Sequence, residues 1–185
     1  ITPVKPDCPI ILFIGDSITS GWNADIHGAE AYPSVVADLL GCVSYVISRY
    51  GINSQQMLES IFTNFVDENR KSFYLRNQSP TYVAIALGTN DSEEVFEQYA
   101  PLLADECQKK FIGAKMIMIG SWHTDKNNTF TEKYCNENGF CYSRPKNVGD
   151  KIPSSSSHPN TKGHYQLGKY IAESMCKHWG RSKFE

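Results

Sequence analysis

The sequence contains no hydrophobic run long enough to cross a membrane. Its longest apolar run covers residues 9–14, whereas a spanning helix needs about 18 or more such residues. It also lacks an excess of charge of one sign, because 18 basic residues are balanced by 20 acidic ones to give a net charge of −2. This balance excludes a general electrostatic attraction to nucleic acid or to an anionic membrane surface.

Internal repeats, low-complexity tracts and long charge runs are also absent from the 185 residues. Hydrophobic residues make up 41% of the chain and charged residues 21%, a composition that excludes a disordered or fibrous protein. A chain of this length buries roughly 70% of the surface that its unfolded form exposes. We therefore expect a single domain over residues 1–185, and a monomer.

Six cysteines are present, but no C-x-x-C pair, so zinc-ribbon and thioredoxin-like sites are excluded. Six cysteines in a chain that begins without Met are typical of a mature exported protein, which predicts a secreted or extracytoplasmic location with disulfide bonds. Cys135 and Cys141 are close enough in sequence to close a small loop. Six cysteines allow 15 full pairings. The alternative is six buried free thiols in a cytosolic enzyme.

Apolar runs that suit buried strands alternate with segments of helical periodicity. The predicted strands cover residues 10–14, 43–47, 82–87 and 116–119, with a short fifth strand near 140–142. Four helices are expected, and three of them have candidate caps at Asn53 or Ser54, at Ser92 and at Asn160. Pro101 should kink or divide the third helix. This alternation predicts a three-layer α/β fold with a mostly parallel sheet.

Polar segments follow three of these strands, and a fourth precedes the last helix. They are residues 15–21, 49–53, 88–91 and 157–160. In parallel sheets the ligand site lies at the carboxyl ends of the strands, so these segments should meet. They supply a hydroxyl at Ser17, a flexible backbone donor at Gly51, an amide at Asn90 and an imidazole at His158. Acyl transfer needs this set, namely a nucleophile, a base and donors for the oxyanion.

Each of these residues also has an ordinary structural explanation. Ser17 could cap a helix, Gly51 could occupy a turn, Asn90 could form an Asx turn, and His158 could lie on a surface loop. The order of the four segments favours the catalytic interpretation over these alternatives.

The residues Gly15-Asp16-Ser17-Ile18, Gly51, Gly88-Thr89-Asn90-Asp91 and His158-Pro159-Asn160 resemble the four blocks of the SGNH, or GDSL, hydrolase family. All four blocks are present in order and extend over about residues 10–178. The resemblance implies a flavodoxin-like sheet of about five parallel strands. It also implies Ser17 as nucleophile, His158 as general base, and an oxyanion hole made by the Ser17 and Gly51 backbone and the Asn90 amide.

One departure from the family pattern concerns the group that orients the histidine. The family usually has an Asp three residues before the His, and Ser155 occupies that position here. A Ser–His dyad with a serine or carbonyl as orienting group, another acid, or a loss of activity would each account for this difference. Asp150 and Asp125 are the nearest acids in the preceding loop.

The resulting hypothesis is a secreted serine esterase that acts on small acyl esters, chiefly acetyl esters of carbohydrates. Trp22, Trp122 and His123, together with Tyr50, are candidates for a sugar-binding cleft, although each could equally serve in packing. One alternative is a lysophospholipase or thioesterase with a long acyl groove. Another is a catalytically silent glycan-binding module on the same fold.

The sequence gives no reason to expect a metal ion or cofactor. His158 and His164 do not have the spacing of metal ligands on a helix, and no Cys/His cluster accompanies them. We expect His164 to face solvent or to contact its own helix.

Overall fold

The fold is built on a five-stranded sheet, described here from a computed structural model that covers residues 8–61, 79–121, 125–144, 154–155 and 158–180. The strands are β1 (Ile10–Gly15), β2 (Val43–Ser48), β3 (Tyr82–Ala86), β4 (Lys115–Ile119) and β5 (Cys141–Ser143). Their order is β2-β1-β3-β4-β5, and every neighbouring pair is parallel. This flavodoxin-like order confirms the predicted fold class.

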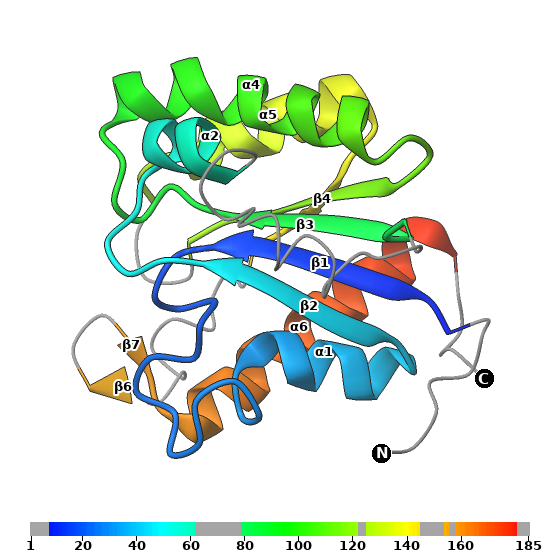
Figure 1. Cartoon of the computed structure of the whole chain (residues 1–185). Coiled ribbons are helices and arrows are strands. Elements are labelled where there is room, and N and C mark those ends of the chain that lie inside the picture. Colours follow the sequence, from blue (N-terminus) through cyan, green and yellow to red (C-terminus); the bar gives the residue numbers. More distant parts are fainter. Residues whose placement is uncertain (1–7, 62–78, 122–124, 145–153, 156–157, 181–185) are drawn as a thin grey trace.

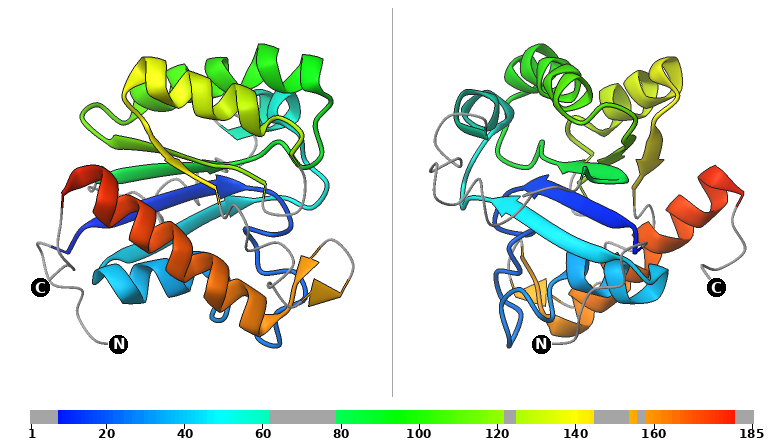
Figure 2. Two further views of the ribbon diagram at one scale, coloured as in Figure 1. Left: turned by 180° about the vertical axis from the view of Figure 1, so that it is seen from behind. Right: turned by 45° about the vertical axis from the view of Figure 1, so that its right-hand side comes forward.

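Helices cover both faces of the sheet, which gives three layers (Figure 1). One face carries α2 (Ser54–Ile61), α4 (Glu93–Lys110) and α5 (Asn128–Asn138), and the other carries α1 (Tyr32–Leu40) and α6 (Thr161–Trp179). Figure 2 shows the same separation from behind. Each face of the sheet therefore has its own hydrophobic core.

Strand β1 lies at the centre of both cores. Its side chains alternate between the two faces, with Leu12 and Ile14 packed on the α4 side and Ile11 and Phe13 on the α1 side. All six residues of β1 are buried. A continuous apolar run is what a central parallel strand requires, because neither of its faces meets water.

The predicted helix caps are present. Ser92 accepts a hydrogen bond from the Val95 N–H, and Asn160 accepts one from the Gly163 N–H. Asn53 forms a reciprocal capping box with Gln56, since each side chain accepts a hydrogen bond from the other's backbone N–H. The caps satisfy N–H groups that the first turn of a helix leaves without a partner.

Of the two outcomes predicted for Pro101, a kink or a division of the third helix, the division is wrong, because α4 continues through that residue. A proline removes only one backbone hydrogen bond from the helix. The inner face of α4 buries Phe96 and Ala100 before Pro101 and Leu103 after it, so packing supports the helix on both sides of the proline. Helix α5 was not predicted, since only Asn128, Thr131 and Cys135 of its 11 residues are buried.

The structure does not show the predicted disulfide bonds, since none joins any two of the six cysteines, all of which lie in the described ranges. Cys135 belongs to the core on the α4 side, and Cys141 belongs to the core on the α6 side. Cys8 donates a hydrogen bond from Sγ to the Gly41 carbonyl. None of the helices in the described ranges is long and apolar enough to span a lipid bilayer.

The turn after β1 leaves no room for a side chain at position 15. A Cβ placed on Gly15 would lie 2.0 Å from Thr19 Oγ1 and 2.9 Å from the Ala86 carbonyl oxygen. The glycine therefore lets the chain turn directly under the carboxyl end of β3. This close approach places the residues after Gly15 at the centre of the sheet edge.

The cap of α6 gives a first testable prediction. Replacing Asn160 with Ala should lower the free energy of unfolding by about 1 kcal/mol, because the Gly163 N–H loses its acceptor. Urea unfolding followed by circular dichroism measures the change. The exposed Asn136 in α5 provides the matched control, and Asn136→Ala should change stability by no more than about 0.5 kcal/mol.

Candidate active site

Ser17 and His158 form a hydrogen-bonded pair at the carboxyl edge of the sheet. Ser17 Oγ lies 2.9 Å from His158 Nε2, although the residues are 141 positions apart in the chain. Ser17 follows β1 by two residues, and His158 lies in the short strand β7 (His158–Pro159) just before α6. The distance is that of a serine activated by an imidazole base.

A tight turn holds Ser17 at the end of β1. The Ser17 carbonyl accepts hydrogen bonds from the Trp22 N–H at 3.0 Å and from Ser20 Oγ at 2.8 Å. The Asp16 carbonyl accepts one from the Ser20 N–H. Within the described residues, the Ser17 N–H donates no hydrogen bond, so it is available to an anion in the pocket.

Gly51 lies next to this turn in the loop after β2 and has a φ of 68°. That left-handed conformation favours glycine. Its N–H also has no acceptor in the part of the chain that the structure describes, and Gly51 lines the same pocket as Ser17. The two predicted backbone donors are thus brought together.

Asn90 completes the group, but its amide is already engaged. Asn90 Nδ2 donates hydrogen bonds to Asp16 Oδ2 at 3.3 Å and to the Ile52 carbonyl at 3.1 Å. Its loop is held by Asp91, which accepts hydrogen bonds from the N–H groups of Gly88 and Ser54. Asp91 therefore ties the loop after β3 to the start of α2.

His158 is held through its backbone. Asn23, which has a φ of 74°, donates a hydrogen bond from Nδ2 to the His158 carbonyl at 3.3 Å. The short strand β6 (Ser154–Ser155) pairs antiparallel with β7, and this pairing sets Ser155 opposite His158. The predicted orienting residue is thus adjacent to the histidine in the backbone register.

His164 is buried rather than exposed, so the prediction that it faces solvent or its own helix is wrong. Its Nδ1 accepts a hydrogen bond from the Tyr32 N–H at 3.4 Å, and therefore Nε2 carries the proton and donates to the Trp22 carbonyl at 3.2 Å. The ring stacks on Tyr32 at a centroid distance of 6.4 Å. His164 thus fastens α6 to the loop that carries Trp22.

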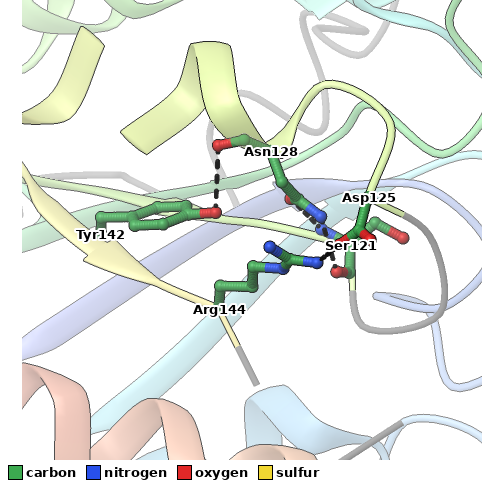
Figure 3. A network of polar contacts seen from close by, with 5 residues as sticks. All are labelled: Ser121, Asp125, Asn128, Tyr142 and Arg144. Carbon is green, nitrogen blue, oxygen red and sulfur yellow. Dashed lines mark hydrogen bonds and ion pairs between the residues drawn. The ribbon is translucent and has the colours of Figure 1, made fainter. Parts of the chain in front are cut away.

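Asp125 is engaged at the far side of the sheet edge. It forms an ion pair with Arg144, and its side chain is 90% exposed. Figure 3 shows this pair beside Asn128, which exchanges hydrogen bonds with the backbone of Ser121 and accepts one from Tyr142 Oη through its carbonyl. The partner of the Asp125 carboxylate is therefore Arg144. Asp150, Trp122 and His123 lie outside the described residues.

A pocket of about 320 Å³ opens over the Ser17–His158 pair. Trp22 and Tyr50 stand at its rim, where they are 45% and 53% exposed. Their rings meet edge to face at 4.7 Å, and the Trp22 ring lies 6.3 Å from that of His158. The volume suits a small ligand, with an aromatic wall on one side.

The protonation of the site follows from burial. Desolvation lowers the pKa of His158 below its usual value, which keeps the imidazole neutral and able to accept a proton near pH 7. Burial raises the pKa of Asp16 to about 6, in spite of backbone hydrogen bonds that lower it. Burial also raises the pKa of Asp91.

Sequence reasoning missed Asp16, Asn23 and His164 as parts of the site. Asp16 directly precedes Ser17 in the chain, so its position was a usable signal. Asn23 and His164 carried no signal, because each acts on a residue more than 130 positions away. Asn127 begins a glycosylation sequon, yet it is buried and donates a hydrogen bond to the Gly88 carbonyl.

Comparison with known proteins supports the architecture. No protein-family profile matches the sequence. An acetylxylan esterase of Xylanibacter ruminicola is 24% identical over 212 aligned positions, which cover 92% of this chain and 44% of that protein. The chain therefore spans less than half the length of this curated relative.

Solved structures resemble the chain over nearly all of its length. A family two carbohydrate esterase from Clostridium thermocellum, in complex with cellohexaose, has a TM-score of 0.75 at 18% identity and covers 97% of this chain and 67% of that one. A protein from Desulfitobacterium hafniense assigned to the G-D-S-L lipolytic family has a TM-score of 0.68 at 16% identity, with coverages of 89% and 98%. The predicted resemblance to SGNH hydrolases is thus confirmed in the fold.

The burial of His164 predicts a pH-dependent loss of stability. Burial lowers the pKa of His164 in the folded chain, so the unfolded chain binds the proton more readily as the pH falls below about 6.5. The wild-type chain should therefore lose up to about 1.4 kcal/mol between pH 7.5 and pH 5.5, relative to a chain without this imidazole.

His164→Gln is the matched variant, because an amide can accept from Tyr32 and donate to Trp22 but does not titrate. Urea unfolding of both proteins at the two pH values gives the difference. Parallel pH dependences of the two proteins would contradict the assignment.

Proposed function

We propose that this chain is a serine esterase that removes small acyl groups, chiefly acetyl, from carbohydrate. The observation that carries the proposal is the 2.9 Å contact between Ser17 Oγ and His158 Nε2, beside two backbone N–H groups without acceptors among the described residues. A hydroxyl, a neutral base and converging donors are what ester cleavage requires. The SGNH-type fold of the chain agrees with this chemistry.

The proposed reaction has two steps. His158 Nε2 takes the proton of Ser17, and Oγ attacks the ester carbonyl while the N–H groups of Ser17 and Gly51 and the Asn90 amide bind the oxyanion. The alcohol leaves with the proton from His158, and an acyl-serine remains. A water molecule then gives its proton to His158 and attacks the acyl group, which releases the acid and restores Ser17.

The imidazolium formed in each step needs an acceptor for its second N–H. In enzymes with a full Ser-His-Asp triad, the Asp provides this acceptor. We propose that the segment containing Ser155 fills this role, since its backbone is paired with that of His158 in the β6–β7 ladder. The chain would then act as a Ser–His dyad oriented by a neutral acceptor.

The pocket favours a short acyl group. Of the residues that line it in the described part of the chain, Ile18 is the one aliphatic side chain. A second cavity of about 20 Å³ adjoins Ile18 and Thr89, which also line the first pocket. That volume holds about one water molecule, so these walls suit acetyl better than a lipid chain.

The rim favours a sugar as the alcohol. Trp22 and Tyr50 expose aromatic faces at the mouth of the pocket, and such rings bury the apolar faces of sugars while their edges stay wet. The sequence comparison also favours a sugar ester, because the curated relative is an acetylxylan esterase. Acetylated xylan is therefore the proposed substrate class.

Replacing Ser17 with Ala should abolish the hydrolysis of p-nitrophenyl acetate, because no other group would form the acyl intermediate. The loss expected for a nucleophile is about 10⁶-fold in kcat. Release of p-nitrophenol at pH 8 measures it, and thermal unfolding checks that the fold is intact. Ser34→Ala in α1 is the matched control and should keep full activity; an active Ser17→Ala enzyme would rule the proposal out.

Acyl chain length separates the proposal from its alternatives. Turnover of p-nitrophenyl esters should be highest for acetate and fall steeply from butyrate to octanoate, because the described walls offer no long apolar groove. A maximum at octanoate would instead indicate a lipid acyl hydrolase. Absence of turnover at every chain length would indicate a silent glycan-binding module.

Replacing Trp22 with Ala tests the sugar platform. The KM for an acetylated xylo-oligosaccharide should rise about 3- to 10-fold, as expected for the loss of one ring contact. The kinetics with ethyl acetate, followed by acetate release, should hardly change, because that alcohol has no ring to stack. An equal effect on both esters would show that Trp22 acts on the catalytic pair instead.

A further inference from the structure

We infer that Asp16 is a positioning residue of this active site, and that its carboxylate holds the Asn90 amide in place to bind the oxyanion. Because only the ionised carboxylate performs this task, Asp16 also makes the activity depend on a second proton besides that of His158. This inference rests on the esterase function proposed above and deepens it.

Asp16 lies between the nucleophile and the third oxyanion donor. Its side chain is only 2% exposed and sits in the turn directly before Ser17. Oδ1 accepts a hydrogen bond from the Ile18 N–H at 2.9 Å, and Oδ2 accepts one from Asn90 Nδ2 at 3.3 Å. One carboxylate therefore links the loop after β1 to the loop after β3.

The two contacts of Asn90 define the plane of its amide. Nδ2 has two hydrogens, and one points to Asp16 while the other points to the Ile52 carbonyl beside Gly51. With both hydrogens engaged, the side chain cannot rotate freely about its last torsion. The hydrogen that points to Asp16 makes the longer contact, so it is the one that an oxyanion in the pocket would share with the carboxylate.

Only an ionised carboxylate fits this position. Two N–H donors, from Ile18 and Asn90, converge on Asp16, so its side chain must present an acceptor to each. An asparagine has a single acceptor oxygen, and its NH₂ group would face one of the donors. A protonated carboxyl group has the same defect, since its own O–H competes with the donor that it faces.

The surroundings of Asp16 raise its pKa toward neutral pH. Burial raises the pKa of Asp16 to about 6, and Asp91 from the loop after β3 raises it further, while backbone hydrogen bonds oppose the shift. The charge of Asp16 also helps to raise the pKa of Tyr32 in α1. His158 is connected to the same turn through its contact with Ser17. Among the described residues, Asp16 makes no ion pair.

A buried acid without a cationic partner weakens the fold, because desolvation of its charge is not compensated. Groups of this kind concentrate at functional sites. Here the carboxylate touches the backbone next to the nucleophile and the side chain of an oxyanion donor. The placement is explained if Asp16 serves the transition state rather than the stability of the fold.

A double-mutant cycle tests the inference. The four proteins are the wild type, Asp16→Asn, Asn90→Ala and the double variant, and Asp38→Asn on the exposed face of α1 is the matched control. Acetate release from p-nitrophenyl acetate gives kcat and KM between pH 4.5 and pH 9. Circular dichroism at each pH confirms that the proteins are folded.

At pH 8, Asp16→Asn should lower kcat by about 10- to 100-fold, the range for a residue that supports a catalytic group, with little change in KM. Asn90→Ala should lose about 10²–10³-fold. In the Asn90→Ala background, Asp16→Asn should cost less than about threefold, because its target is gone. Asp38→Asn should retain full activity.

The acid limb of the pH profile provides a readout that a purely structural role would not change. In the wild type, log(kcat/KM) should rise with a slope approaching two below pH 6, because both His158 and Asp16 must lose a proton. In Asn90→Ala the slope should fall to one. This comparison remains decisive even if Asp16→Asn does not fold.

Two outcomes would overturn the inference. If Asp16→Asn loses the same factor with and without Asn90, the carboxylate acts elsewhere. If the wild type and Asn90→Ala share one acid-limb slope, Asp16 does not control the amide. An inactive wild-type chain would instead overturn the esterase function itself, together with everything that rests on it.

Discussion

Parallel pairing of β1 with both β2 and β3 is the constraint on which the rest of the structure depends. Gly15, the last residue of β1, is in register with Ser48 of β2 and Ala86 of β3. Three loops must therefore begin at the same edge and at nearly the same height. Ser17, Gly51 and Asn90 come from these three loops, so the pairing of the strands brings the three residues to one place.

His158 is brought to this edge by α6 rather than by the sheet. His158 precedes α6, and α6 packs against α1 and the sheet through Leu167, Ile171 and Met175. Buried His164 then joins α6 to the Trp22 loop, and Asn23 holds the His158 backbone. Apolar packing thus sets the position of α6 as a whole, whereas a few directional hydrogen bonds set the position of the imidazole to within the reach of Ser17.

Much of the fold could be predicted because its signals are local. An apolar run such as residues 10–14 is compatible with a buried strand whatever surrounds it, and the caps at Ser92 and Asn160 act within their own first turns. Helix α5 was not predicted because it buries few residues. Pro101 does not divide α4, because the packing of the helix outweighs one missing hydrogen bond. The disulfide bonds stay a prediction, because pairing depends on which face of the sheet each side chain joins.

By itself, the sequence determined the alternation of strands and helices, the resemblance to SGNH hydrolases, and the identities of Ser17, Gly51, Asn90 and His158 as candidates. Those signals survive in one dimension because they are residue types at fixed places after strands. Only the tertiary structure decided that Asp16 bridges to Asn90, that Asp125 belongs to Arg144, and that His164 is buried under the Trp22 loop. Such contacts join residues far apart in the chain, and their directions exist only once the sheet and its helices have packed.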